Sequence, residues 1–368
     1  MKKLLFVVLA ALLLAHPGKS AAQVQRPRLV VGLVVDQMRW DYLYYYYDQY
    51  RTDGLRRLLD QGYSFQNTLI NYLPAVTAVG HSSIYTGSVP AFTGIVSNNF
   101  YINGRPTYCV SDSTVTPVGT TADEGRMSPR NLLATGIGDM LKMATDGRSK
   151  VIGISLKDRA AILPAGFAAD GAYWWGKKAG HFVTSTYYRN DLPEWVKRVN
   201  REVQVKSGTN VFTSVVGVTK TFQLADAAID NEQLGQDSVT DLLAISVSST
   251  DAIGHTYGTR GTENHDVYME LDRQVAAFLK TLDEKVGRGN YLVFLSADHG
   301  ASHNPNLLKQ RRIPAGGLEM WNWVKPVEQK LEARFGFAPV ILNVSNNVVF
   351  LNHAGAAKAG KSISDIKA

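Results

Sequence analysis

The sequence predicts an α/β fold in which helices cover both faces of a largely parallel central sheet. Four apolar runs are nearly continuous rather than alternating, as in strands that are buried on both faces. They span residues 29–35 (LVVGLVV), 151–156 (VIGISL), 242–247 (LLAISV) and 291–295 (YLVFL). Between them lie longer stretches with helical periodicity, such as 127–143 and 264–282. Alternating strands and helices are the pattern of a layered α/β domain.

Residues 1–22 have the features of a secretory signal peptide. Lys2 and Lys3 precede an apolar run over 4–15 that is too short to span a bilayer, and small residues follow at 20–22. An uncleaved membrane anchor is the alternative interpretation. No other segment is long and apolar enough to cross a membrane. We expect cleavage, export to the periplasm or the medium, and a mature α/β domain over 23–368.

The composition is ordinary for a globular protein, and its mild positive charge is compatible with anionic substrates. With 45% hydrophobic and 19% charged residues, the chain is not of a disordered, collagen-like or coiled-coil type. Loss of the signal peptide would lower the formal charge of +7 but leave it positive, without the clustering that nucleic-acid binding requires. Cys109 is the only cysteine, so we expect no internal disulfide and a packed, structural role for its thiol.

Residues 160–240 differ in texture from the rest of the chain, because aromatic side chains alternate there with many polar residues. We interpret this segment as an insertion or cap beside the site. An equally weighted alternative is a peripheral subdomain whose aromatic side chains pack only its own core. The aromatic residues are Tyr173, Trp174, Trp175, Phe182, Tyr187, Tyr188 and Trp195.

Each of the four predicted strands runs directly into polar, chemically capable side chains. In open parallel sheets, ligands bind outside the carboxyl ends of the strands, so we expect these side chains to meet at one edge. Strand by strand, they are Asp36; Lys157 and Arg159; Asp251 and His255; Asp298 and His299.

The carboxylates and histidines among these residues predict a metal site. Carboxylate oxygen and imidazole nitrogen together suit Zn²⁺. Asp251 and His255 stand four positions apart in TDAIGH, so both can reach one ion from a helical turn, and Asp298 and His299 are adjacent in SADHG. A single aspartate at a strand end is more often a helix cap, but the joint pattern on three strand ends favours metal.

Thr77 lies between a loop that contains Pro74 and a predicted helix that ends near Gly87. One interpretation makes Thr77 a helix N-cap. In the other, its hydroxyl lies at the positive end of the helix, where backbone N–H groups bind phosphate. A metal ion would lower the pKa of the hydroxyl and make Thr77 a nucleophile.

Further side chains suit the binding of a phosphoryl group. Lys157 and Arg159 in SLKDR stand two apart, and on an extended segment they would point the same way and neutralise phosphate oxygens. A solvated basic loop is the alternative. Asn98 in GIVSNNF can donate an amide hydrogen to a phosphate oxygen, and chemistry alone does not distinguish it from Asn99.

The motifs that carry these residues resemble the alkaline phosphatase superfamily. Within it, the chain is most similar to the secreted phosphate-irrepressible alkaline phosphatases with a threonine nucleophile, from about residue 31 to its end. The motifs are VVGLVVDQMRWDYL, NYLPAVTAVGHSSIYTGSVPAFTGIVSNNF, VIGISLKDRAAILPAG, LLAISVSSTDAIGHTYG and YLVFLSADHGA.

This resemblance implies an exported phosphomonoesterase that hydrolyses small phosphorylated substrates through a phosphothreonine intermediate and two Zn²⁺ ions. It implies one ion held by Asp36, Thr77, Asp298 and His299. It implies a second ion held by Asp251 and His255, and a phosphoryl group held by Asn98, Lys157 and Arg159.

The chain departs from the family pattern near its end. In the family, the second Zn²⁺ takes a further histidine from a segment well downstream of the DHG motif. Here the only later histidines are His303 and His353, and neither lies in a matching motif. We therefore expect the sequence to be a C-terminal truncation of a longer protein, with one ligand beyond Ala368.

Two other functions remain open from the sequence. One is a phosphodiesterase or nucleotide pyrophosphatase on the same scaffold, and the other is a non-catalytic fragment that binds phosphate or one ion. Lys157 and Arg159 favour the monoester, because a diester has fewer charged oxygens to pair with them, and the resemblance ties the pair to monoesterases. A sulfatase is not expected, because its oxidisable Cys or Ser motif is absent around Thr77.

Overall fold

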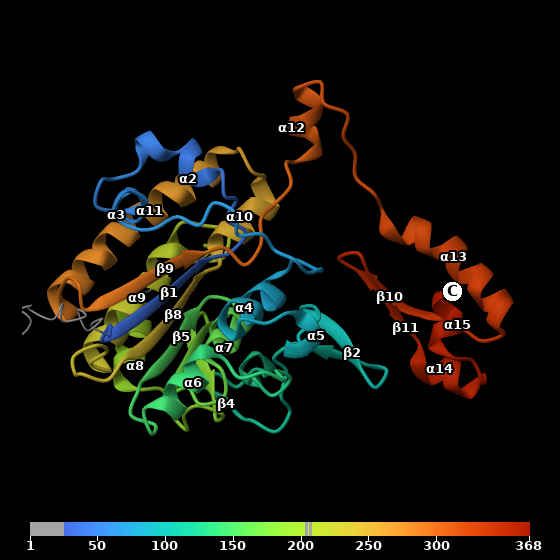
Figure 1. Cartoon of the computed structure of the whole chain (residues 1–368), viewed down its shortest axis with the longest axis horizontal. Helices are drawn as coiled ribbons and strands as arrows, with labels where there is room; N and C mark the ends of the chain where they lie inside the picture. Colours follow the sequence, from blue (N-terminus) through green and yellow to red (C-terminus); the bar gives the residue numbers. More distant parts are fainter. Residues whose placement is uncertain (1–25, 203–204, 206–207) are drawn as a thin grey trace, which may run out of the picture.

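A seven-stranded sheet forms the centre of the protein in a computed structural model (Figure 1). The structure describes residues 26–202, 205 and 208–368, so the predicted signal peptide lies outside the described residues. The strand order is β4-β7-β6-β5-β8-β1-β9. Its five consecutive parallel strands are β6 (Gly171–Gly176), β5 (Val151–Ser155), β8 (Asp241–Val247), β1 (Leu29–Val35) and β9 (Tyr291–Ser296). The α/β fold and the four predicted strands are confirmed.

Helices cover both faces of the sheet because alternate residues of its central strands are apolar on both sides. On one face, Leu33 and Leu243 pack in the same core as α9 (Val216–Asn231) and α11 (Thr262–Leu282). On the other face, Val34 and Leu242 pack with Tyr85 of α4 (Thr77–Thr86). Further elements of the body are α2 (Tyr42–Tyr45), η1 (Tyr47–Gln49), α3 (Leu55–Gln61), α5 (Pro90–Thr93), η2 (Asp123–Gly125), α6 (Ile137–Ala144), α7 (Asp158–Ala165), α8 (Glu194–Glu202), α10 (Ser249–Tyr257) and η3 (Asp283–Gly287).

The strands within residues 160–240 belong to the main sheet and not to a separate cap, so this interpretation is corrected for them. β6 continues the main sheet beside β5, and β7 (His181–Ser185) pairs with β6 on one side and with β4 (Pro117–Val118) on the other. Tyr173, Trp174 and Phe182 are buried in the cores of the body. In the sequence alone, an aromatic-rich strand within the main sheet therefore cannot be distinguished from an inserted cap.

The helix predicted over 127–143 is also corrected, whereas the one predicted over 264–282 is confirmed as α11. The first of these stretches contains only α6, which begins at Ile137. The carboxylate of Asp139 accepts a hydrogen bond from the backbone N–H of Gly136 at 2.8 Å and so fixes the start of the helix there.

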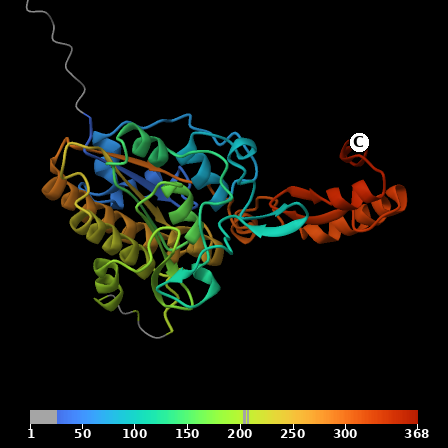
Figure 2. The same cartoon turned by 90° about the horizontal axis from the view of Figure 1, so that it is seen from below.

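The C-terminal segment lies beside the body (Figures 1 and 2). After α12 (Pro305–Gln310) it forms α13 (Met320–Phe335), the hairpin of β10 (Ile341–Ser345) and β11 (Val348–Leu351), α14 (His353–Lys358) and α15 (Ile363–Lys367). The ring of Phe350 lies 5.4 Å from that of Tyr101, on the hairpin of β2 (Asn99–Ile102) and β3 (Arg105–Tyr108). None of the described helices is long and apolar enough to cross a bilayer.

Asp226 on α9 is expected to make folding less favourable as the pH rises. Burial raises its pKa to about 6, above the ordinary aspartate value, and its Oδ1 has no hydrogen-bond partner among the described residues. Because the folded-state pKa lies above the unfolded one, stability is lost as the pH rises toward and through this value. Asp226→Asn should therefore stabilise the protein at mildly alkaline pH by about 2 kcal/mol in urea unfolding.

The matched control for this prediction is Asp230→Asn, one turn along the same helix. Asp230 is exposed and forms a surface ion pair with Lys285 at 2.8 Å, so its loss should change stability little. If Asp226→Asn left the pH dependence of unfolding unchanged, another group would be responsible.

Candidate metal and phosphate site

Three strands deliver acids and an imidazole to one edge of the sheet. Asp36 directly follows β1, Asp251 lies in the first turn of α10 after β8, and Asp298 and His299 follow β9. Ligand atoms of Asp36, Asp251 and His299 all lie within 4.8 Å of one another. His299 Nε2 is 3.5 Å from Asp36 Oδ1 and 3.6 Å from Asp298 Oδ2. The predicted convergence of Asp36, Asp251, Asp298 and His299 is therefore observed.

Unpaired oxygens in this cluster fit a metal ion. Asp36 Oδ1 and Asp298 Oδ2 are buried and have no hydrogen-bond partner among the described residues. Leaving such oxygens unpaired costs about 1–3 kcal/mol each, which a bound cation would offset. His299 Nδ1 lies 2.9 Å from the carbonyl oxygen of Gly300, so its proton is assigned there and Nε2 presents a lone pair to the acids.

The carboxylates of the cluster differ in their affinity for protons. Burial, together with the charge of Asp298, raises the pKa of Asp36 to about 6. Burial also acts on Asp298 and Asp251, but neighbouring charges outweigh it: His81 lowers the pKa of Asp298, and His255 and Lys157 lower that of Asp251. The cluster thus carries negative charge at neutral pH, which favours cation binding.

Lys157 connects the acids to the predicted nucleophile. It occupies the N-cap position of α7, and its Nζ lies 2.7 Å from Asp36 Oδ2, 2.5 Å from Asp251 Oδ2 and 3.2 Å from Thr77 Oγ1. Only 10% of the side chain is exposed, so these charge-assisted contacts are little screened.

Thr77 is the first residue of α4 rather than its N-cap. Val76 holds the N-cap position, and its side chain makes no capping hydrogen bond. The helix-cap interpretation is therefore wrong. The hydroxyl lies at the positive end of a ten-residue helix that points into the site.

Asn98 lies beside Thr77, and the structure separates it from Asn99. Asn98 Oδ1 accepts the backbone N–H of Ala78 at 2.9 Å, which leaves its Nδ2 as a donor toward a ligand. Asn99 is exposed and begins β2. Asn98, Thr77 and Arg159 line one cavity of about 500 Å³ together with Asp251, His255 and His299.

Arg159 and Lys157 do not share an extended segment, contrary to the prediction. Arg159 is the second residue of α7, and its Nη1 donates to Tyr108 Oη at 3.0 Å, while Lys157 turns to the acids. The helix starts at Asp158 because the residues after it form an apolar helical run that packs with β6 and β7. The two cations thus approach the site from different directions.

His255 is placed next to Asp251 but outside the buried cluster. Its Nε2 is 3.1 Å from Asp251 Oδ1, one helical turn away, and 72% of its side chain is exposed. His303 lines the same cavity and contacts Thr259 Oγ1 at 2.8 Å, whereas His353 begins α14 in the C-terminal segment.

Three supporting residues were missed by sequence reasoning. Gln37 has a φ of 63° and donates from its backbone N–H to Asp298 Oδ1 (3.0 Å) and from Nε2 to Asp251 Oδ1 (2.8 Å). His81 Nδ1 lies 2.8 Å from the carbonyl oxygen of Thr77 and 3.2 Å from Asp298 Oδ2. Because its hydrogen bond is directed to the carbonyl, Asp298 Oδ2 receives no directed hydrogen bond from His81. The helical spacing from Thr77 to His81 is the signal that could have revealed it.

Gly80, the third of these residues, lets α4 approach the site closely. A Cβ there would collide with the backbone of Asp298, so Gly80→Ala should destabilise the fold by about 1–3 kcal/mol and lower metal content. Gly316→Ala is the control, since its Cβ meets nothing within 4 Å in the described part of the chain. Unfolding and metal analysis of both variants test this; equal stability of the two would contradict it.

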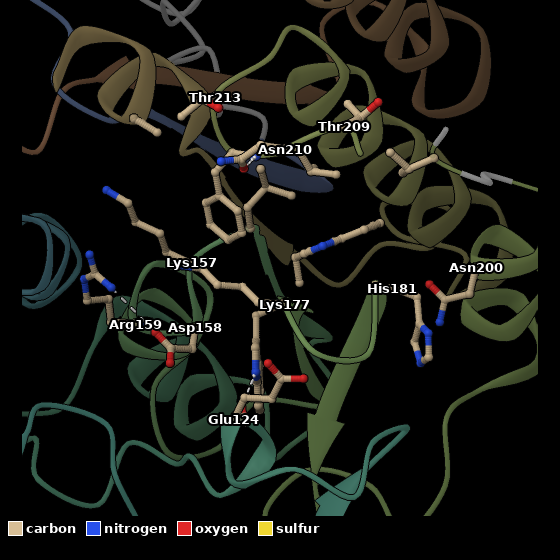
Figure 3. Close-up of a pocket in the computed structure, with 18 of the residues that line it drawn as sticks. Glu124, Lys157, Asp158, Arg159, Lys177, His181, Asn200, Thr209, Asn210 and Thr213 are labelled. Atoms are coloured by element: carbon tan, nitrogen blue, oxygen red, sulfur yellow. Dashed lines mark hydrogen bonds and ion pairs between the residues drawn. The ribbon is translucent and has the colours of Figure 1, made fainter. Parts of the chain in front are cut away.

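A larger cavity of about 1040 Å³ shares Arg159 with the smaller one (Figure 3). It is lined by Lys157 and Arg159 together with Glu124, Lys177 and residues 209–213. The larger cavity is not lined by Thr77, Asp251 or His299, whereas the smaller cavity is lined by all three, so the smaller cavity is the one that adjoins the acid cluster.

Known proteins resemble the chain over most of its length. A model of the type I phosphodiesterase / nucleotide pyrophosphatase family matches residues 30–333. A Myroides odoratus protein described as a calcium-transporting ATPase is 43% identical, over 91% of this chain and 71% of its own length. Alkaline phosphatase PafA of Elizabethkingia meningoseptica is 42% identical, over 94% of this chain and 72% of its own length.

Solved structures of alkaline phosphatase PafA match the fold. The wild-type crystal structure superposes with a TM-score of 0.86 and 41% identity, covering 93% of this chain and 75% of that one. A second structure is of a variant in which one threonine, one asparagine, one lysine and one arginine are replaced. The intervals between its threonine and asparagine, and between its lysine and arginine, equal those from Thr77 to Asn98 and from Lys157 to Arg159.

Proposed function

The chain belongs to the type I phosphodiesterase / nucleotide pyrophosphatase family, among the alkaline phosphatases related to PafA, and on this premise we propose that it is an exported, zinc-dependent phosphomonoesterase. Thr77 is its nucleophile. Its substrates are small phosphorylated molecules, and export depends on residues 1–22.

One juxtaposition carries the proposal. Lys157 Nζ lies within 3.2 Å of the Thr77 hydroxyl and within 2.7 Å of Asp36, so a nucleophile candidate adjoins the acid cluster. The ends of different strands and the N-terminus of α4 build this arrangement. A hydroxyl beside a cation site and a helix N-terminus is suited to attack on a phosphoryl group.

The residues divide into metal-holding and phosphoryl-holding groups. When bound, zinc would lower the pKa of the threonine hydroxyl and counter the charge of the phosphoryl group. The residues that would hold it are Asp36, Thr77, Asp298 and His299 at one position and Asp251 and His255 at the other.

The reaction proceeds in two displacements at phosphorus. Thr77 Oγ1 forms a bond to phosphorus as the ester oxygen leaves, which gives phosphothreonine and an alcohol. Water then displaces Thr77 Oγ1 and releases inorganic phosphate. Lys157, Arg159 and Asn98 Nδ2 counter the charge on the non-bridging oxygens in both steps.

A direct comparison of esters tests the reaction class. We expect kcat/KM for p-nitrophenyl phosphate to exceed that for bis-p-nitrophenyl phosphate by at least about 100-fold, because two cations match the charge of a monoester. The second candidate is a diesterase, which the description of the matching family favours. Faster turnover of the diester would establish that alternative.

Removal of metal should abolish activity. Dialysis against a chelator is expected to lower monoester turnover by more than about 100-fold, and added Zn²⁺ should restore it. Elemental analysis of the restored protein separates zinc from other ions. Full activity after complete loss of metal would refute zinc dependence, and a protein that binds zinc without turnover would be a non-catalytic fragment.

A further inference from the structure

Tyr108 holds one edge of the Arg159 guanidinium. Its hydroxyl accepts a hydrogen bond from Arg159 Nη1 at 3.0 Å and donates one to Asp158 Oδ1 at 2.5 Å. The same Asp158 oxygen accepts the backbone N–H of Arg159 at 2.6 Å, and Figure 3 shows Asp158 and Arg159 side by side. The hydroxyl is thus fixed in both of its hydrogen-bonding roles, which orients the arginine.

The other edge of this guanidinium is available to a ligand. Arg159 Nε is buried and has no hydrogen-bond partner in the described part of the chain. A buried, charged donor without a partner is costly, and a bidentate anion placed on the Nε and Nη2 edge would satisfy it. Arg159 lines the cavity that contains Thr77 and Asn98, so such an anion would lie beside the nucleophile.

The hairpin of β2 and β3 helps to position both Asn98 and Arg159, the neutral and the charged side chain proposed to bind phosphate. Asn98 directly precedes β2, its carbonyl oxygen accepts the N–H of Cys109 at 3.0 Å, and Tyr108 is paired with Asn99 across the hairpin. Asn98 and Arg159 therefore reach the cavity with their relative positions set by residues 98–109.

We propose that Tyr108 is a positioning residue that gives this site its preference for phosphate monoesters. It fixes Arg159 so that the Nε edge meets a dianionic phosphoryl group. A diester places a second organic group on one of these oxygens, so it gains less from the fixed arginine. The inference rests on the proposed phosphomonoesterase function.

Tyr108→Phe removes the hydroxyl and keeps the ring. We expect kcat/KM for p-nitrophenyl phosphate to fall by about 10–30-fold, while that for the bis ester stays within about threefold. Tyr101→Phe is the matched control on the same hairpin, since its ring packs against Phe350, and it should leave both rates unchanged. In an Arg159→Ala background, Tyr108→Phe should cause no further loss.

Three outcomes would overturn the role of Tyr108. They are an equal loss of monoester and diester turnover, no loss of either, and a loss that persists in the Arg159→Ala background. Inorganic phosphate gives a readout that does not need turnover: it should raise the thermal midpoint of wild type more than that of Tyr108→Phe. If wild type hydrolysed no monoester, the proposed function would fail, while the phosphate shift would still decide whether Tyr108 positions Arg159.

Discussion

Thr77→Ala is expected to lower kcat/KM for a phosphate monoester by at least about 10⁴-fold, because it removes the atom that forms the bond to phosphorus. The fold should survive. The side chain caps no helix, and the backbone contacts at the start of α4 come from Val76 and Asn98. Stopped assays with p-nitrophenyl phosphate and thermal unfolding measure both quantities on the same preparation.

Thr77→Ser is the matched control for the nucleophile. It keeps a hydroxyl at the positive end of α4, 3.2 Å from Lys157 Nζ in the parent chain, and loses only a methyl group. We expect it to retain activity within about 10–100-fold of wild type. Acid-quenched wild type and Thr77→Ser should both carry a phosphoryl group on residue 77 by mass spectrometry. Parental turnover by the alanine variant would show that another residue attacks phosphorus.

Much of the fold was predictable because its strands are buried on both faces. Runs such as 29–35 and 242–247 have no polar alternation, and only a sheet covered by helices explains them. A helix is predicted over 127–143 because the apolar spacing there suits one. The helix begins only at Ile137, where Asp139 accepts a hydrogen bond from the backbone just before it. The strands at 171–185 misled because aromatic residues fit a sheet core as well as a separate module.

The residues of the candidate site also include some that the sequence could predict and some that it could not. Residues at the ends of parallel strands must meet, so Asp36, Asp251 and Asp298 were predictable from topology alone. Lys157 and Arg159 were correctly placed at the site edge, but their directions depend on where α7 begins. Contacts such as those of Gln37 and Tyr108 join segments far apart in the chain, and no local pattern encodes them.

Asp36→Asn is expected to separate function from stability. Asparagine has the same shape but supplies one weak neutral oxygen where the cluster needs a carboxylate, so bound zinc and monoester turnover should each fall by at least about 100-fold. Burial raises the pKa of Asp36 to about 6, above the unfolded value, so ionisation of Asp36 above that pH costs folding free energy. An asparagine does not ionise.

The expected result is therefore a variant that is inactive yet at least as stable as wild type when both are unfolded in chelator at mildly alkaline pH. Lys157 keeps a counter-ion in this variant, because Asp251 Oδ2 lies 2.5 Å from its Nζ. Asp48→Asn, at an exposed position, controls for the loss of one negative charge. A thermal midpoint that drops in chelator would instead make Asp36 a structural partner of Lys157. The acidic side chains of a metal site repel one another until a metal ion binds. Replacing one of them by a neutral residue should therefore raise stability in chelator while it abolishes activity.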